Sequence, residues 1–170
     1  MSKKIAVLLA KDFEDSEFSD PVQALKDAGH EVIVIGAEKG QTLAGKNGDV
    51  KAETDAAIEG TDPSGFDALL IPGGWSPDHL RTDGRMVAFA KAMVEADKPV
   101  AAVCHGPQLL IEADVVRGHR MTSFESVRTD LRNAGAEVVD EDVVLDGPFI
   151  TSRTPDDLPA FNAALLHRLS

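Results

Sequence analysis

The stretch Pro99-Val-Ala-Ala-Val-Cys-His-Gly-Pro-Gln-Leu-Leu-Ile111 decides the fold of this chain. Its apolar first half predicts a short buried strand that stops at Cys104, the only cysteine of the protein. A sharp turn at His105-Gly106 and a helix from Pro107 are expected to follow. This elbow would hold the sulfur at the edge of a sheet, facing the positive end of the helix. We therefore expect a depressed thiol pKa and a cysteine enzyme or thiol sensor.

Apolar runs alternate with helical patterns along the rest of the chain. Strands are predicted at residues 5–10, 31–37, 67–71, 99–103, 138–139, 143–145 and 149–152, and helices at 21–28, 84–96, 124–133 and 155–169. Because the main strands are almost continuously apolar, we expect an α/β fold with a mostly parallel sheet and helices on both faces. Residues 40–60 predict only a loop or small hairpin. No composition break divides residues 1–170, so one domain is expected.

Composition excludes several classes of protein. The chain is 43% hydrophobic and 27% charged, which is typical of a globular domain. A formal net charge of -12 argues against nucleic acid as a partner, because phosphates would be repelled over most of the surface. One cysteine permits no intramolecular disulfide, so the fold does not depend on an oxidising compartment.

The remaining patterns indicate a cytoplasmic protein without a membrane segment, metal or cofactor. The first apolar run is cut off at Lys11-Asp12, too early for a secretion signal, and no run could span a bilayer. The other histidines show no metal-ligand spacing with the single cysteine, so zinc is not expected; they are His30, His79, His119 and His167.

Residues with chemical potential follow three of the predicted parallel strands. Asp12-Phe-Glu-Asp-Ser-Glu17 follows the first, Pro72-Gly-Gly-Trp-Ser-Pro-Asp78 the third, and Cys104-His105 the fourth. Ligands of an open parallel sheet bind beyond the carboxyl ends of its strands. We therefore expect these three segments to converge on one edge.

Each candidate has a structural and a chemical interpretation. Cys104 could be a small buried hydrophobic residue, but the elbow favours a nucleophile. Glu17 could complement a helix dipole, or carry a raised pKa and exchange a proton with the thiol. Gly74 could end a strand or offer its N–H to an oxyanion. The N–H of His105 suits the same role, whereas its ring reaches the sulfur only if the elbow bends sharply. Ser152-Arg-Thr-Pro-Asp-Asp157 predicts a helix start capped by Thr154.

The segment Ala102-Val-Cys-His-Gly-Pro-Gln-Leu-Leu-Ile111 resembles the signature of the PfpI family, within the superfamily of the Parkinson-associated protein and the class I glutamine amidotransferases. Further segments match the family's order and spacing over nearly the whole chain: Phe13-Glu-Asp-Ser-Glu17, Phe66-Asp-Ala-Leu-Leu-Ile-Pro-Gly-Gly74, Asn133-Ala-Gly135 and Ser152-Arg-Thr-Pro-Asp-Asp-Leu-Pro-Ala-Phe161. The sequence is most similar to the bacterial general-stress members.

This resemblance implies a flavodoxin-like three-layer sandwich and roles for individual residues. Cys104 would be the nucleophile with Glu17 beside it, and the N–H groups of Gly74 and His105 would form an oxyanion hole. Peptidase-type members complete a triad with an acid from a neighbouring subunit, at the position of Asp78; their acid is typically glutamate, one methylene longer. The resemblance also implies a homo-oligomer, a dimer or higher.

Three functions are compatible with the resemblance. The first is a deglycase or glyoxalase-like hydrolase, which acts on small dicarbonyls and their early adducts with amino groups. The second is an intracellular cysteine peptidase, and the third is a non-enzymatic redox sensor or holding chaperone that uses Cys104. A dicarbonyl needs only a good thiolate, whereas amide cleavage also needs an accurately placed base and leaving-group acid. We therefore rank the carbonyl chemistry first.

Overall fold

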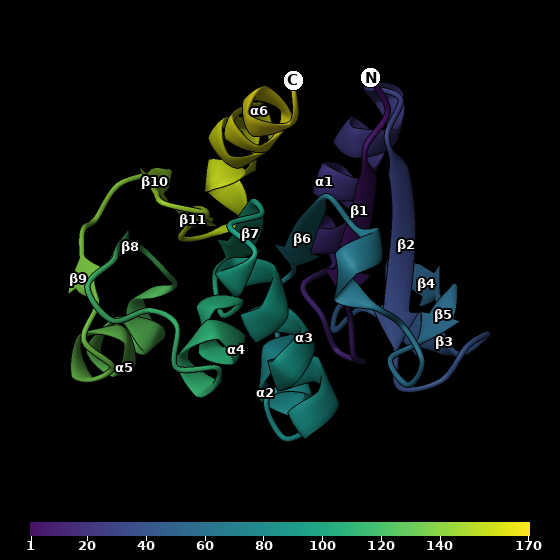
Figure 1. Cartoon of the computed structure of the whole chain (residues 1–170), viewed down its shortest axis with the longest axis horizontal. Coiled ribbons are helices and arrows are strands. Elements are labelled where there is room, and N and C mark those ends of the chain that lie inside the picture. The colour runs from purple at the N-terminus through teal and green to yellow at the C-terminus, as the bar shows by residue number, and fades with distance from the viewer.

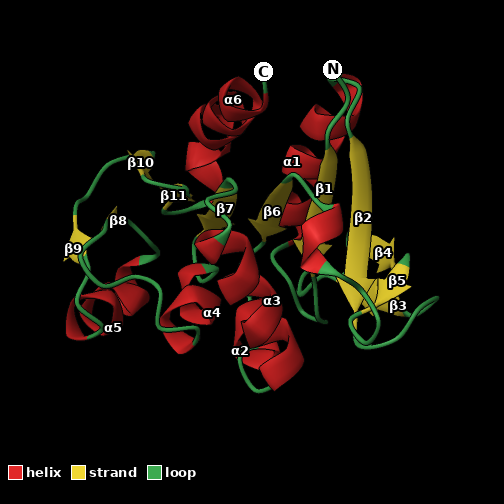
Figure 2. Cartoon of the chain, viewed as in Figure 1, coloured by secondary structure: helices red, strands yellow, loops and turns green.

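A computed structural model describes all residues, 1–170, and is organised around a seven-stranded sheet (Figures 1 and 2). In spatial order its strands are β10 (Val144–Asp146), β11 (Phe149–Ser152), β7 (Val100–Val103), β6 (Ala68–Ile71), β1 (Lys4–Leu8), β2 (Glu31–Gly36) and β5 (Ala56–Ala57). Every neighbouring pair is parallel except β10 with β11. The predicted mostly parallel sheet is therefore confirmed.

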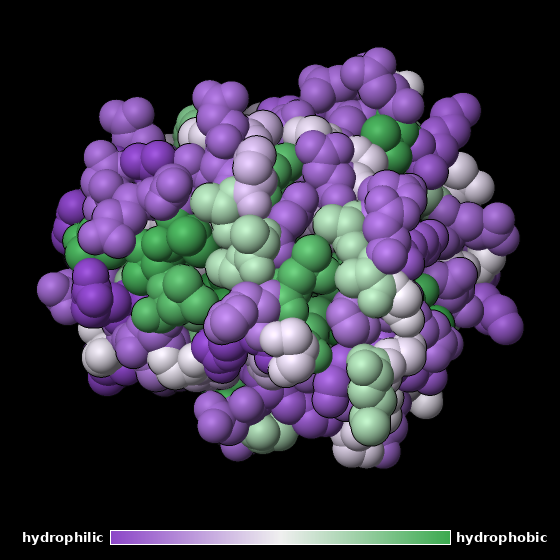
Figure 3. Space-filling view, turned by 90° about the horizontal axis from the view of Figure 1, so that it is seen from above, coloured by the Kyte–Doolittle hydropathy of each residue, from purple (hydrophilic) through white to green (hydrophobic).

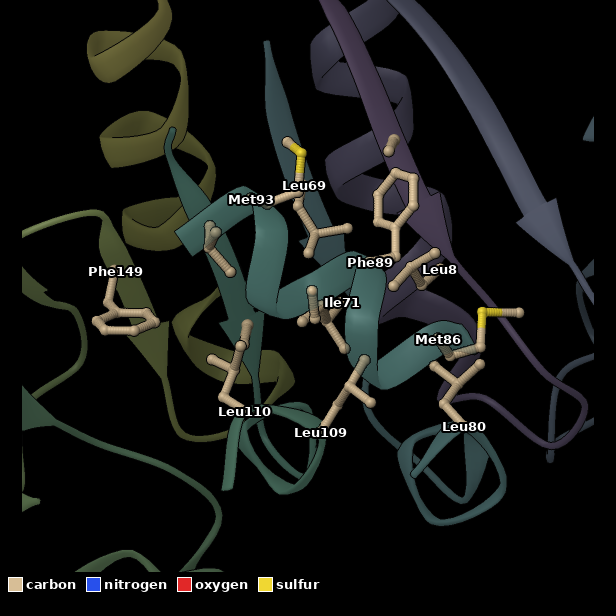
Figure 4. Close-up of a cluster of buried hydrophobic side chains, with 14 of the residues drawn as sticks. Leu8, Leu69, Ile71, Leu80, Met86, Phe89, Met93, Leu109, Leu110 and Phe149 are labelled. Carbon is tan, nitrogen blue, oxygen red and sulfur yellow. The ribbon is translucent and has the colours of Figure 1, made fainter. Parts of the chain in front are cut away.

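Helices cover both faces of this sheet. They are α1 (Asp15–Asp27), α2 (Ser76–Leu80), α3 (Gly84–Glu95), α4 (Pro107–Glu112), α5 (Arg128–Asn133) and α6 (Leu158–Leu169). Alternate residues of β1 enter two separate cores: Ile5 and Val7 pack with α1 and α6, whereas Ala6 and Leu8 pack with α3 and α4. Figure 4 shows the second core, in which Phe89 and Met93 of α3 lie over strand residues such as Leu69 and Ile71. The result is the expected three-layer sandwich.

The two small sheets lie outside this frame. Residues 40–60 form the antiparallel hairpin of β3 (Thr42–Ala44) and β4 (Lys51–Glu53), followed by β5. A short parallel pair joins β8 (Arg120–Met121) to β9 (Glu137–Val138) beside α5. The hairpin agrees with the expectation of a small excursion from the sheet.

The prediction that the first helix begins near Pro21 is wrong, because α1 begins at Asp15. Asp15 and Glu17 place two acidic side chains in the first turn, and the ionised Asp15 complements the helix dipole. Pro21 lies inside the helix, where it cannot donate a hydrogen bond to the carbonyl of Glu17. The acidic first turn therefore extends the helix upstream of a residue that usually marks a start.

Smaller differences concern the other helices. The sequence did not predict α2, a single short turn after the Gly73-Gly74 segment. The helices expected from 124 and 155 begin with 3-10 turns, Glu125–Val127 and Pro155–Asp157. Thr154 makes no side-chain cap at the second of these. Asp157 holds that turn instead, accepting hydrogen bonds from the backbone and guanidinium of Arg153.

The topology brings the carboxyl ends of β7, β6 and β1 side by side at the lower edge of the sheet in Figure 1. These are the three strands followed by the candidate site residues, so the predicted convergence is confirmed. The opposite edge, seen from above in Figure 3, carries mainly hydrophilic residues around a broken band of hydrophobic ones. No helix of the chain is long and apolar enough to cross a membrane.

Candidate active site

Cys104 occupies a tight elbow between β7 and α4. Its φ of 63° is a left-handed conformation that few residues other than glycine adopt, and such strain concentrates at functional sites. The Cys104 N–H donates to the carbonyl of Ser152 at 3.0 Å, and its own carbonyl accepts from the N–H of Phe124 at 2.8 Å. A Cβ on Gly106 would lie 2.6 Å from the Ile71 carbonyl oxygen. Only glycine therefore fits where the elbow passes the neighbouring strand.

Glu17 reaches the elbow from the first turn of α1. Its side chain is fully buried, and its Oε1 accepts a hydrogen bond from the N–H of Gly73 at 3.0 Å. A Cβ on Gly73 would press against Glu17 Oε1 and lie 3.0 Å from Cys104 Cβ. The missing side chain at Gly73 therefore lets the carboxyl and the thiol approach each other. The second oxygen, Oε2, is buried and has no conventional hydrogen-bond partner.

Burial is the main cause of the shifted pKa values of Glu17 and Cys104. It raises the pKa of Glu17 to about 8, and the neighbouring charge of Glu14 adds to the effect. Burial also raises the pKa of the Cys104 thiol, and a negative charge on Glu17 raises it further. The predicted depression of the thiol pKa is therefore wrong for the resting site. The elbow alone favours a depressed pKa, but burial of the sulfur disfavours its charged form.

Glu17 and Cys104 consequently titrate as a pair. Near pH 7 the carboxyl is protonated, because its pKa is about 8. The carboxyl lies beside Cys104, and in its protonated form it can donate a hydrogen bond to a thiolate. The arrangement can stabilise a thiolate once the thiol proton has been removed.

The ring of His105 lies on the sulfur, with Nδ1 3.3 Å from Cys104 Sγ. The elbow thus bends sharply enough for the ring to reach, which was the condition attached to it above. Its Nε2 lies 3.3 Å from the hydroxyl oxygen of Ser126, and the ring stacks on Phe124 with centroids 4.8 Å apart. Burial, followed by the charge of Lys46, lowers the pKa of His105. The imidazole is therefore neutral near pH 7 and able to accept a proton.

Two backbone N–H groups beside this cluster donate to no carbonyl of the chain. Gly74 is held by a bridge to Phe13, in which the N–H groups of Glu14 and Trp75 donate to the carbonyls of Gly73 and Asp12. The N–H of Gly74 itself has no acceptor within the chain, and that of His105 donates to no backbone carbonyl. Gly74 has a φ of 70°, and a Cβ there would lie 2.7 Å from the Asp12 carbonyl oxygen.

In the single chain Asp78 acts on the cluster only through its charge. It is exposed on α2 and makes no hydrogen bond or ion pair. Its charge opposes the lowering of the His105 pKa. A contact with the site of another subunit stays a prediction.

The sequence did not point to Lys46, although it stands over this site. It lies in the turn of the β3–β4 hairpin, where its N–H donates to the Phe13 carbonyl and its Nζ pairs with Glu14 Oε2, both at 2.8 Å. Its positive charge lowers the pKa values of both Glu17 and Cys104. Ser126 was also missed: it lies in the 3-10 turn Glu125–Val127, within a predicted helix, and nothing in that pattern indicates a contact with His105. The structure places no group of three or more His, Cys, Asp or Glu residues where they could hold a metal ion.

Fold and site together define a flavodoxin-like α/β protein with a cysteine at a strand-to-helix elbow. The chain belongs to the DJ-1/PfpI family, whose pattern matches residues 3–168. It is 53% identical over 170 residues to protein/nucleic acid deglycase 2 of Escherichia coli, covering 99% of both chains. It is 55% identical over 163 residues to general stress protein 18 of Bacillus subtilis, covering 95% of both.

A further relative is YraA of Bacillus subtilis, whose name assigns it provisionally to the cysteine proteases; it is 53% identical over 169 residues, covering 99% of both chains. Among solved structures, DJ-1beta of Drosophila melanogaster matches with a TM-score of 0.91 at 29% identity, covering 99% of this chain and 91% of that one. A two-domain protein of Anabaena variabilis, with DJ-1/ThiJ/PfpI-like and ferritin-like domains, matches with a TM-score of 0.97 at 45% identity. That match covers 99% of this chain but 48% of the two-domain protein.

Proposed function

We propose that this chain is a cysteine-dependent hydrolase of reactive dicarbonyls and of their early glycation adducts, a deglycase or glyoxalase-like enzyme. The observation that carries the proposal is the buried pair of Glu17 and Cys104, in which a carboxyl with a pKa near 8 stands against the only thiol. The name of the Escherichia coli relative, protein/nucleic acid deglycase 2, supports the same substrate class.

The first step adds the sulfur to the aldehyde carbon of a dicarbonyl such as methylglyoxal. His105 Nδ1, 3.3 Å from Sγ, accepts the thiol proton as the S–C bond forms. The π electrons of the C=O bond move to oxygen, where the N–H groups of Gly74 and His105 can stabilise the charge. Glu17 then gives its proton to that oxygen, which leaves a hemithioacetal and a Glu17 carboxylate.

The second stage converts the hemithioacetal into a hydroxy acid. The Glu17 carboxylate removes the proton from the carbon that carries sulfur and returns it to the former ketone carbon, while the hydroxyl proton on the first carbon passes to the former ketone oxygen. The first carbon is oxidised and the second reduced within the same molecule, so no external oxidant or cofactor is needed. Water cleaves the resulting thioester, which releases lactate and regenerates the thiol.

The test compares wild type with Cys104→Ser on free methylglyoxal and on its adduct with N-acetylarginine. We expect Cys104→Ser to lower turnover of both by at least about a thousandfold, because the nucleophile is lost. Circular dichroism checks that the variant is folded. Wild-type turnover no higher than that of the variant would refute the proposal. A scavenger of free methylglyoxal distinguishes the two activities. If the adduct is lost no faster with enzyme than with the scavenger alone, the enzyme acts on the free dicarbonyl, as a glyoxalase does, and not on the adduct.

A peptidase is the second candidate. The His105 ring contacts the sulfur, and Asp78, four residues after Gly74, is exposed and so accessible to another copy of the chain. In this case Asp78 from another copy of the chain would complete a triad. Protein-substrate hydrolysis should then vanish in Asp78→Ala and on dilution to monomers, as followed by analytical ultracentrifugation. Hydrolysis that survives both treatments would exclude the shared triad.

A further inference from the structure

A cavity of about 260 Å³ opens at the carboxyl ends of β1 and β2, and none of the residues assigned to the candidate active site lines it. Its walls come from the end of β1, the β2–β3 segment, α2 and the start of α3. In Figure 1 these elements lie toward the lower edge of the sheet. Crevices outside the carboxyl ends of parallel strands are where open α/β sheets bind their ligands.

The floor of the cavity is apolar and fixed in place. Leu9, Leu43, Leu80 and Met86 contribute to it, and each is at most 5% exposed. Figure 4 shows Leu80 and Met86 side by side at the end of the buried cluster. Because these side chains belong to the two hydrophobic cores, the floor is preformed and offers an apolar ligand a dry surface.

The rim of the cavity carries polar side chains without partners, among them Lys11 and His79, and one that is already paired, Asp83. Lys11 forms no ion pair, and the ring of His79 has no hydrogen-bond partner, so both can donate to a ligand. The carboxylate of Asp83 is already occupied: it caps α3 through the Arg85 N–H and accepts from the Arg85 guanidinium at 3.0 and 2.9 Å. The uncommitted charged and aromatic groups at the rim, Lys11 and His79, are therefore donors, and the amide of Gln41 can donate as well.

We propose that this cavity binds a small amphipathic carboxylate, with its apolar body on the leucine and methionine floor and its carboxylate at Lys11 and His79. The volume lies just below the ~300 Å³ at which pockets for drug-sized ligands begin, which limits the body to roughly the size of octanoate or phenylacetate. The ligand would contact α2, the helix that follows Gly74 and Trp75. The site is independent of the proposed chemistry at Cys104.

The only tryptophan provides the readout, because the chain contains no tyrosine and Trp75 is the sole indole. Its carbonyl accepts a hydrogen bond from the N–H of His79 at 3.3 Å, so a ligand on His79 should alter its emission. We expect octanoate to give a saturable change with a Kd of about 1 mM or below, and octanol, which lacks the charge, to bind at least about fivefold more weakly. Backbone NMR shifts should concentrate at Lys11, Gln41 and His79.

Two variants locate the site. Lys11→Gln should weaken octanoate at least about fivefold and leave octanol unchanged, whereas Lys39→Gln, an exposed lysine outside the cavity, should change neither. Ala37→Phe places a bulky side chain at an exposed lining position and should weaken both ligands. Binding in Cys104→Ser should match wild type. No saturation by about 10 mM octanoate, shifts centred on Cys104, or equal binding by Lys11→Gln would each overturn the proposal.

Discussion

Burial of the Glu17 carboxyl lowers the stability of the fold and raises the pKa of this group. A fully buried carboxyl with one hydrogen bond from Gly73 and an oxygen without a conventional partner is a costly group to fold around. The fold tolerates it because the proton stays on the carboxyl near neutral pH. That proton is also what the proposed chemistry needs.

Glu17→Gln should therefore change how stability depends on pH. The folded-state pKa is raised to about 8 from a usual value of 4.5, so the native state holds this proton more tightly than the unfolded chain. The free energy of unfolding should then fall, by up to a few kcal/mol, as pH rises from about 4.5 to about 8. The variant should lose this slope. Urea unfolding of both proteins at several pH values measures it, and parallel curves would contradict the burial argument.

Lys46→Met should slow the alkylation of Cys104. The ammonium lowers the pKa of both Glu17 and Cys104, and it neutralises Glu14, whose charge raises the pKa of Glu17. Because Lys46 is partly exposed, we expect a modest effect, about two- to fivefold slower reaction with iodoacetamide at pH 8. Lys39→Met is the matched control. An unchanged pH–rate profile would remove Lys46 from the electrostatics of the site.

The sequence was a better guide to which residues lie at the site than to their pKa values and contacts. Cys104, Glu17 and Gly74 could be chosen because each follows a strand in a parallel sheet. The thiol pKa could not be predicted, because it depends on the depth of burial and on the distance to Glu17 rather than on the elbow alone. Lys46 reaches the cluster from a hairpin turn and Ser126 from a 3-10 turn, and long-range contacts of this kind leave no periodic signal.

Among the elements, the β3–β4 hairpin is attached to α1 by one buried carboxylate. Asp15 is 5% exposed and accepts hydrogen bonds from the N–H groups of Asn47, Asp49 and Val50 at 2.9 to 3.0 Å. A Cβ on Gly45 would lie 2.6 Å from its Oδ1, so the turn fits only with glycine there. This attachment is what carries Lys46 to the mouth of the site.

Asp15→Ala should release the hairpin turn. Losing three charge-assisted hydrogen bonds should cost about 2–4 kcal/mol of unfolding free energy and speed hydrogen exchange at residues 47, 49 and 50. Burial opposes ionisation, but these N–H groups hold the pKa of Asp15 below its usual 3.8. The stabilisation that Asp15 gives the folded state is therefore present above about pH 4 and is lost as pH falls further. Asp20→Ala, an exposed aspartate of the same helix, should leave exchange in the turn unchanged; equal protection in Asp15→Ala would contradict the attachment.

The elbow between β7 and α4 should tolerate no side chain at Gly106. A Cβ there would lie 2.6 Å from the Ile71 carbonyl oxygen and 3.0 Å from the Val103 backbone, so β6 and α4 must separate. We expect Gly106→Ala to lower the unfolding free energy by at least about 2 kcal/mol. Gly84→Ala, where nothing lies within 4 Å, is the control. Similar thermal melting of the two variants would show that the elbow can relax.

Most elements followed from pattern, and the exceptions have local causes. Continuous apolar runs identified β1, β2, β6, β7 and β11 because strands buried on both faces need no alternation. Pro21 misplaced the start of α1, since proline favours a first turn but can also lie inside a helix that packing stabilises. The short α2 escaped notice because five residues give no measurable helical period.

For the whole molecule, the order β7-β6-β1 is the feature that creates the site. It brings a thiol, a buried carboxyl and the N–H groups of Gly74 and His105 to one edge, although Glu17 and Cys104 are 87 residues apart in sequence. The exposed Trp75 and Asp78 border this edge, with Trp75 at 59% exposure. A second copy of the chain packed here stays our expectation for the oligomer.

The central claim is that Cys104 attacks the carbonyl carbon of a dicarbonyl. Lactate formed from ¹³C-labelled methylglyoxal, followed by NMR for wild type and Cys104→Ser side by side, tests it most directly. We expect steady lactate production by wild type and none above the uncatalysed rate by Cys104→Ser. Equal lactate production by both proteins would contradict it.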